Sequence, residues 1–85
     1  MKQLVVTIQA EAGLHARPAG VLVKKAGEFA SKITIEKAGK SIDAKRLLAV
    51  LSLGAKKGDE LTITAEGADE EAAVLAIKEV IESEQ

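Results

Sequence analysis

Four segments of the chain alternate apolar and polar residues with a period of two, as a β-strand with one buried face does. The first covers residues 4–8 and the last covers residues 60–66. Between them, residues 32–36 and 41–43 alternate in the same way on either side of Lys37-Ala38-Gly39, so we expect a hairpin there. The pattern therefore predicts four strands.

Three further segments repeat apolar residues at spacings of three and four, which predicts helices with one buried stripe. The first runs over residues 16–30, and the second is the short segment 47–53, which Gly54 closes because glycine accepts the left-handed conformation. The third begins after Asp69, a residue type that caps helices, and carries acidic residues at 70–71, where they favour the helix dipole. The predicted order is β-α-β-β-α-β-α.

The one-sided alternation of the strands determines the layers that we expect. A strand with one dry and one wet face belongs to a sheet covered on one side only, which favours an antiparallel sheet over a parallel sheet covered on both sides. Helices packed on the dry face make a two-layer α+β sandwich. A chain of 85 residues has room for one modest core, so we expect a single domain over residues 1–85.

Composition excludes several kinds of site and partner. The net charge of -1 argues against a nucleic-acid binder with a broad basic surface. The chain has no cysteine, so it has neither a disulfide nor a thiolate metal site, and we expect no metal ion and no cofactor. Its first residues enter a β-like alternation instead of an apolar signal core, and no apolar run approaches the roughly 20 residues of a membrane span. We therefore expect a cytoplasmic monomer that does not insert into membranes.

The candidate chemistry centres on the segment Gly13-Leu14-His15-Ala16-Arg17-Pro18-Ala19. Proline is tolerated only in the first turn of a helix, so Pro18 places His15, the only histidine of the chain, at or near the N-cap. Histidine is a poor N-cap compared with serine, threonine, aspartate or asparagine. A local rule broken without structural gain is typical of a functional site.

A helix N-terminus attracts anions, because unpaired backbone N–H groups and the positive end of the dipole lie there. The N–H groups of Ala16 and Arg17 have no intrahelical acceptor, and the Arg17 guanidinium matches the oxygens of a phosphate. An imidazole beside a bound phosphate is either a nucleophile, which makes a phosphohistidine, or a general base. The plainer interpretation is an awkward cap beside a solvated arginine.

Two surfaces near this site are candidates for contact with a partner, and the first is the outer face of the helix that begins at Ala16. Arg17, Gly20 and Lys24 lie on this face, opposite the buried stripe. Glycine inside a helix costs about 1 kcal/mol relative to alanine, which either close approach of another protein or a tolerated defect explains. Lys24 and Lys25 add positive charge for an acidic partner, unless they are simply solvated.

The second surface is the short leucine-rich helix. Such a helix buries one stripe, which Leu47, Val50 and Leu53 satisfy, and this leaves Leu48 and Leu51 facing outward, with Leu47 as a further candidate for exposure. An exposed apolar patch on a small protein marks a partner site. The alternative is a helix buried on all sides, or a buried strand.

The first motif, together with Ser52-Leu53-Gly54 and the order of the elements, resembles the HPr family, the histidine-containing phosphocarriers of the bacterial phosphoenolpyruvate-dependent sugar phosphotransferase system. The resemblance covers essentially the whole chain. It implies an open-faced β-sandwich in which three helices cover four antiparallel strands in the order 1-4-2-3. It also implies a phosphoryl carrier and not an enzyme in its own right.

The resemblance further implies roles for particular residues. His15 accepts a phosphoryl group on Nδ1 from phosphorylated enzyme I and passes it to the enzyme IIA component of sugar transporters. Arg17 assists the transfer and, with Ala16, binds the phosphate. The positions at which the family contacts its partners correspond to Ala16, Gly20, Lys24, Leu47, Leu48 and Leu51.

Two positions depart from the pattern of the family. Many relatives carry a regulatory serine directly before the second helix, and Arg46 stands there in this chain. A phosphate would add about -1.5 to -2 charges beside the partner surface, whereas Arg46 keeps a positive charge. We therefore expect no regulation by a serine kinase at this position. Ala12 is a milder departure, since the family often has a small polar residue there near the imidazole.

Three other functions remain open on the sequence. A paralogous carrier of a nitrogen-related or other kinase branch would use the same chemistry with another partner. A small acylphosphatase-like hydrolase would use Arg17 to bind phosphate, but such a site resembles one that positions water with asparagine, and the chain has no asparagine. A regulatory binding module that has lost the relay would be expected to lose the histidine, and His15 is present.

Overall fold

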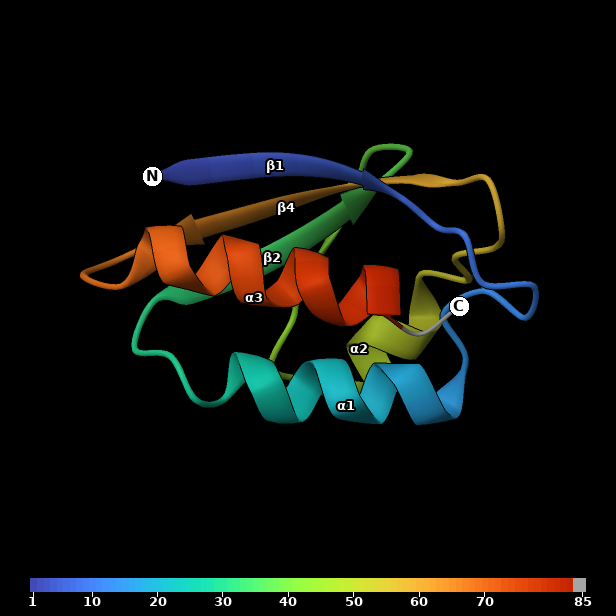
Figure 1. Cartoon of the computed structure of the whole chain (residues 1–85), viewed down its shortest axis with the longest axis horizontal. Helices are drawn as coiled ribbons and strands as arrows, with labels where there is room; N and C mark the ends of the chain where they lie inside the picture. The colour runs from blue at the N-terminus through green and yellow to red at the C-terminus, as the bar shows by residue number, and fades with distance from the viewer. Residues whose placement is uncertain (84–85) are drawn as a thin grey trace.

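A computed structural model describes residues 1–83 of the protein. The elements follow the predicted order β-α-β-β-α-β-α. They are β1 (Lys2–Thr7), α1 (Ala16–Ala26), β2 (Lys32–Lys37), β3 (Lys40–Asp43), α2 (Leu47–Ser52), β4 (Glu60–Glu66) and α3 (Glu70–Ser83). Figure 1 shows α1 and α3 side by side along the sheet, with α2 at the end where α1 begins.

The four strands form one antiparallel sheet in the order β1-β4-β2-β3. The one-sided alternation predicted antiparallel pairing, and the family resemblance implied this strand order; both are confirmed. In the central strand β4, Ile63 lies opposite Leu4 of β1 and Ile35 of β2, so the apolar positions of neighbouring strands share one face. The register therefore gathers the dry faces of the strands into one surface.

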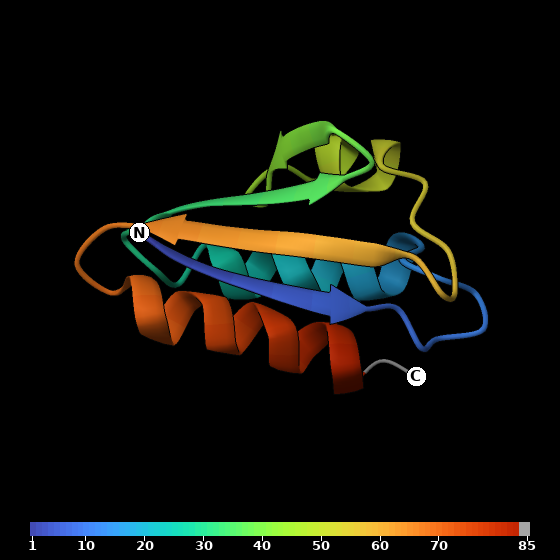
Figure 2. The ribbon, with the colours of Figure 1, turned by 90° about the horizontal axis from the view of Figure 1, so that it is seen from above.

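The core lies between that surface and the helices. Ile33, Ile35, Leu61 and Ile63 are fully buried on the sheet, and Leu22, Ile77 and Ala19 are fully buried on the helices. All three helices pack on this side, and the other face of the sheet is open, as Figure 2 shows. No helix among the described residues is both long and apolar enough to cross a membrane.

The first helix is shorter than its apolar spacing predicts. It ends at Ala26 and not at residue 30, because Gly27 takes the C-cap position and the chain then turns. The N–H of Phe29 donates to the Ala26 carbonyl (3.2 Å), and the half-buried Phe29 ring packs against the core from the turn. Its spacing from the helical stripe therefore reflects tertiary packing and not a continued helix.

The predicted role of Asp69 as a side-chain cap of α3 is wrong. Its carbonyl accepts the N–H of Ala73 (2.9 Å), but its carboxylate accepts the N–H groups of Ala30 and Ser31 (2.9 Å each) and the Ser31 hydroxyl. The turn after α1 brings these unpaired donors to the carboxylate, where they compete successfully with the first turn of α3. The Ser31 hydroxyl and the Ala30 N–H hold the pKa of Asp69 below its usual range.

Candidate functional site

His15 occupies the N-cap of α1, as Pro18 predicted. It has an extended backbone (φ -93°, ψ -168°), its carbonyl accepts the N–H of Ala19 (2.9 Å), and its side chain makes no capping hydrogen bond. The imidazole is exposed. Within residues 1–83, the backbone N–H groups of Ala16 and Arg17 have no acceptor. The helix therefore begins with free donors beside a free imidazole.

The loop before His15 is held from behind by the segment that follows α2. The N–H of the buried Leu14 donates to the Ala55 carbonyl (3.0 Å). Gly13 has a positive φ of 70°, and a Cβ at this position would lie 2.4 Å from the Ala55 oxygen and 2.9 Å from Cα of Lys56. Only glycine fits this close approach without a shift of the backbone. Leu14 before His15 and Pro18 after it are both buried, whereas His15 itself is exposed.

An open groove of about 480 Å³ lies beside the imidazole. Besides His15, it is lined by Ala10, Glu11, Ala12, Arg17, Pro18 and Ser83. Ser83 comes from the far end of α3, and no sequence signal predicted its place here. Because Ala12 is among the lining residues, the departure from the family pattern at this position lies in the site itself.

The charges around the groove favour an anion. The side chain of Arg17 is exposed and makes no hydrogen bond or ion pair with the described part of the chain. Glu11, the acidic residue of the groove, is paired with Lys57 (2.7 Å). The Arg17 guanidinium thus remains available for phosphate oxygens while the neighbouring carboxylate is offset.

The outer face of α1 carries the predicted partner residues. Ala16 and Lys24 are exposed and Gly20 is half-buried. A Cβ at Gly20 would meet nothing within 4 Å, so the packing of this chain does not require glycine there. The absence of a side chain at Gly20 therefore leaves room for another molecule.

The leucines of α2 divide between core and surface. Leu48 is 80% exposed and Leu47 is 42% exposed, whereas Val50 is buried. The alternative of a helix buried on all sides is therefore wrong. Leu51 is half-buried and packs against the core, and Leu47 lies outside the buried stripe that it was predicted to share with Val50 and Leu53. The apolar surface consequently consists mainly of Leu47 and Leu48.

Arg46 is the N-cap residue of α2, and its side chain is exposed and makes no capping hydrogen bond. Gly54, with a φ of 61°, closes the helix as predicted. Figure 1 shows α2 beside the first turns of α1, so the two candidate partner surfaces adjoin the end of the molecule that carries His15.

Comparison with known proteins agrees with this geometry. Residues 2–83 match the family model described as "PTS HPr component phosphorylation site". The chain belongs to the HPr family. Its fold is similar to that of HPr from Thermoanaerobacter tengcongensis (42% identity, TM-score 0.94, covering 99% of this chain and 94% of that one).

Two further solved structures are nearly as similar. HPr from Bacillus anthracis is 39% identical, with a TM-score of 0.90 over 94% of this chain and 95% of that one. The histidine-containing phosphocarrier protein from Mycoplasma is also 39% identical, with a TM-score of 0.92 over 96% and 93%. The chain is thus an HPr-type phosphocarrier of the phosphotransferase system, and the hydrolase alternative is not supported.

Proposed function

We propose that His15 is the residue that carries the phosphoryl group, received from phosphorylated enzyme I and passed to the enzyme IIA component of sugar transporters. The observation that carries the proposal is an exposed imidazole at a helix N-cap without a capping bond, beside N–H groups and an Arg17 guanidinium that have no partner among residues 1–83. In the first step, the Nδ1 lone pair attacks phosphorus and the bond between phosphorus and the donor breaks. The second step repeats this exchange with the acceptor as nucleophile and His15 as leaving group.

The neighbours of His15 stabilise the phosphoryl group during both steps. The N–H groups of Ala16 and Arg17 donate to its oxygens at the positive end of the α1 dipole. The Arg17 guanidinium offsets the charge that the oxygens bring into the groove. No step requires a metal ion or cofactor on this chain.

The partner surface in this proposal consists of Ala16, Gly20, Lys24, Leu47, Leu48 and Leu51. These residues lie on two adjoining helices next to the groove, and four of them, Ala16, Lys24, Leu47 and Leu48, are exposed, whereas Gly20 and Leu51 are half-buried. Leu48→Asp should weaken binding of enzyme I about tenfold or more, because one of the most exposed apolar contacts is lost to a charge. Titration calorimetry measures this, and unchanged affinity would remove Leu48 from the interface.

The decisive experiment is incubation of the protein with phosphoenolpyruvate, Mg²⁺ and enzyme I. We expect acid-labile phosphate on the wild-type chain and none on His15→Ala, with circular dichroism showing that the variant is folded. Absence of label on the wild type would contradict the proposal. Exchange of enzyme I for the donor of a nitrogen-related branch separates the sugar carrier from its paralogous alternative, since the true donor gives the larger kcat/KM.

We also propose that residues 1–85 act as one carrier domain, as a monomer in the cytoplasm, without nucleic acid as a partner. Regulation by a serine kinase at the start of α2 is not expected, because Arg46 offers no hydroxyl there. Sedimentation equilibrium tests the monomer. The broader expectation is that α2 as a whole is not regulated in this way. Incubation with the kinase and ATP, followed by mass spectrometry, tests it, and a modified residue within α2, such as Ser52, would contradict that broader expectation.

A further inference from the structure

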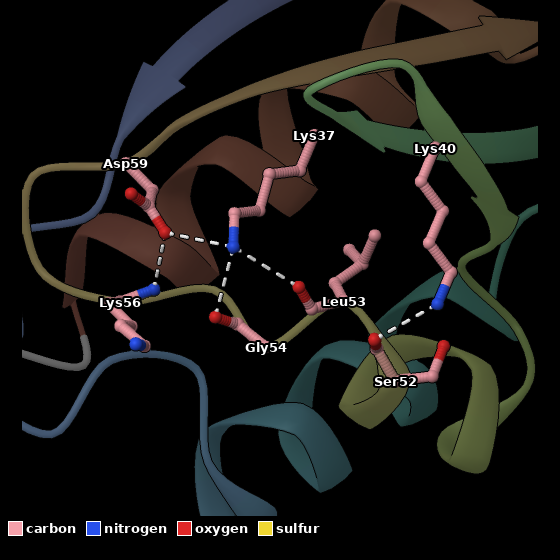
Figure 3. Close-up of polar contacts among 7 residues, drawn as sticks. All are labelled: Lys37, Lys40, Ser52, Leu53, Gly54, Lys56 and Asp59. Atoms are coloured by element: carbon pink, nitrogen blue, oxygen red, sulfur yellow. Dashed lines mark hydrogen bonds and ion pairs between the residues drawn. The ribbon is translucent and has the colours of Figure 1, made fainter.

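The ammonium group of Lys37, at the end of β2, lies among three oxygens on the other side of a loop. Lys37 Nζ is 3.2 Å from the Leu53 carbonyl oxygen, 3.1 Å from the Gly54 carbonyl oxygen and 3.2 Å from Oδ2 of Asp59 (Figure 3). An ammonium has three N–H donors, so each finds an acceptor. By comparison, Lys40 Nζ donates to the carbonyl of Ser52 and Lys45 Nζ to the carbonyl of Phe29.

Two of these acceptors belong to the end of α2. The last carbonyls of a helix lack intrahelical donors, and a cation beside them interacts favourably with the dipole. Lys40 supplies a second ammonium, which donates to the Ser52 carbonyl (3.1 Å; Figure 3). Because α2 has only six residues, its own hydrogen bonds contribute little, and it depends on contacts with the rest of the protein, which include the burial of Val50 and these two ammonium groups.

The third acceptor closes the loop after α2. Asp59 also accepts the N–H of Lys56 (2.8 Å), so the carboxylate joins the two ends of segment 53–59 through Lys37. The side chains of Lys37 and Asp59 are only 25% and 32% exposed. Such a partly shielded pair, with hydrogen bonds to backbone groups, is stronger than a solvated surface pair.

The same segment forms the support of the loop that carries His15. Ala55, the residue after Gly54, accepts the N–H of Leu14 (3.0 Å), and Gly13 packs directly against it. Nearby, Gly58 donates to the Ile8 carbonyl (2.8 Å). Lys37 thus binds the carbonyl of Gly54, and the next residue, Ala55, supplies the carbonyl that holds Leu14 beside His15.

We propose that Lys37 is a positioning residue of phosphoryl transfer, which acts through segment 53–59 on both the His15 loop and the end of α2. In this role it keeps the transferred group at a constant position relative to the apolar surface of Leu47 and Leu48. The inference rests on the proposed roles of His15 and of that surface. It assigns to Lys37 no contact with the phosphoryl group.

The test compares Lys37→Met with Lys32→Met. Lys32 lies at the other end of the same strand, and its exposed side chain makes no hydrogen bond or ion pair within the described part of the chain, so its variant removes the same charge without the three acceptors. In assays with phosphorylated enzyme I, we expect KM to rise and kcat to fall, each about three- to tenfold, for Lys37→Met. Lys32→Met should change neither by more than about twofold.

Hydrogen exchange provides a readout that does not depend on enzyme I. In Lys37→Met, the amide of Leu14 should exchange about tenfold faster relative to that of Ile63 in the centre of the sheet, because the Ala55 carbonyl is held less firmly. Lys37→Arg, which keeps the charge and several donors, should restore most of the transfer rate. If Lys37→Met does not fold, Asp59→Asn weakens the same cluster and takes its place.

The outcomes separate this inference from the proposed function. If the wild type is labelled at His15 and Lys37→Met behaves like Lys32→Met in transfer and in Leu14 exchange, the positioning role is overturned. Equal acceleration of exchange at Leu14 and Ile63, with normal kinetics of the folded fraction, also overturns it, because Lys37 then serves global stability alone. Failure of the wild type to accept phosphate overturns the proposed function instead.

Discussion

The two ends of helix α1 differ in whether the chain itself supplies an acceptor for backbone N–H groups that lack one in the helix. At one end, the donors of Ala30 and Ser31 receive the carboxylate of Asp69, which comes from the loop before α3. At the other end, the donors of Ala16 and Arg17 receive no group from the described part of the chain. Figure 1 shows these loops at opposite ends of the helix layer.

Both ends also depend on a glycine that lies against the backbone of a distant segment. A Cβ at Gly67 would lie 2.8 Å from Cα of Ser31, and a Cβ at Gly13 would lie 2.4 Å from the Ala55 oxygen. Both ends are therefore too closely packed for a side chain at this glycine, and they differ in whether a carboxylate of the chain binds the donors. The fold closes one set of donors with its own carboxylate, and the proposed function assigns the other set to a phosphoryl group from outside.

The largest effect is expected when a carboxylate is placed at the start of α1, where the backbone donors of Ala16 and Arg17 lack an acceptor among the described residues. His15→Asp should abolish the formation of phosphohistidine, because the imidazole is lost. The same change should stabilise the fold by about 1 kcal/mol, because aspartate is a good N-cap. Labelling with enzyme I and urea denaturation measure the two effects, and His15→Ala is the control that loses transfer without gaining the cap. A variant less stable than His15→Ala would contradict the view of this end as an uncapped helix.

Removal of the guanidinium should have the next largest effect. We expect Arg17→Ala to lower kcat of phosphoryl transfer about 10²-fold, because the charge of the phosphoryl group is no longer offset. The free energy of unfolding should change by less than about 0.5 kcal/mol, since the side chain is exposed and unpaired within the described residues. Rapid-quench kinetics measure the rate, and Lys32→Ala, which lies outside the proposed partner surface, is the control for lost charge. Unchanged kinetics would exclude Arg17 from the mechanism.

Substitution of the two close-packed glycines separates stability from transfer. Gly13→Ala and Gly67→Ala should each destabilise the protein by about 1–3 kcal/mol, because each has a positive φ and a close backbone neighbour. Only Gly13→Ala should lower kcat of the folded fraction, since it displaces the loop before His15. Chemical denaturation and transfer kinetics provide the comparison. An equal loss of kcat in both variants would show that the two ends are coupled.

The smallest effect is a dependence on pH of the stability that Asp69 contributes at the other end of α1. The pKa of Asp69 is lowered by the Ser31 hydroxyl and the Ala30 N–H, so its carboxylate stabilises the fold above the unfolded pKa of about 3.9. This stabilisation is lost as pH falls through the lower folded pKa. The difference in unfolding free energy between wild type and Asp69→Asn should therefore shrink below about pH 4. His15→Ala should follow the wild-type pH profile in this range, and a constant difference for Asp69→Asn would contradict the assignment.

Local features of the sequence were enough to predict the order of the helices and strands and the position of His15 at the start of α1. The strand period, the Pro18 rule and the stop at Gly54 each depend on residues within one or two turns, and each is confirmed. Where an apolar residue served a distant contact, the local rule failed. The apolar spacing of Phe29 led to a predicted helix that continued beyond Ala26, but Phe29 lies in the turn after the helix and packs against the core from there.

The groove could be predicted only in part for the same reason. His15 and Arg17 are close in sequence and share one helix turn, so spacing alone placed them together. Ser83 reaches the groove only because α3 packs across the sheet toward the start of α1. Its type and its position in the chain carry no signal of that place.

The sequence by itself determined the order of the elements, the face that each strand buries and the uncapped start of α1, because periodicity and backbone rules act over a few residues. Only the tertiary structure decided that Asp69 binds the turn at Ser31, that Ala55 supports Leu14, and that Lys37 joins these supports to α2. These contacts join segments that are far apart along the chain. Such contacts form only when the whole chain is folded, so the periodicity of a few neighbouring residues contains no information about them.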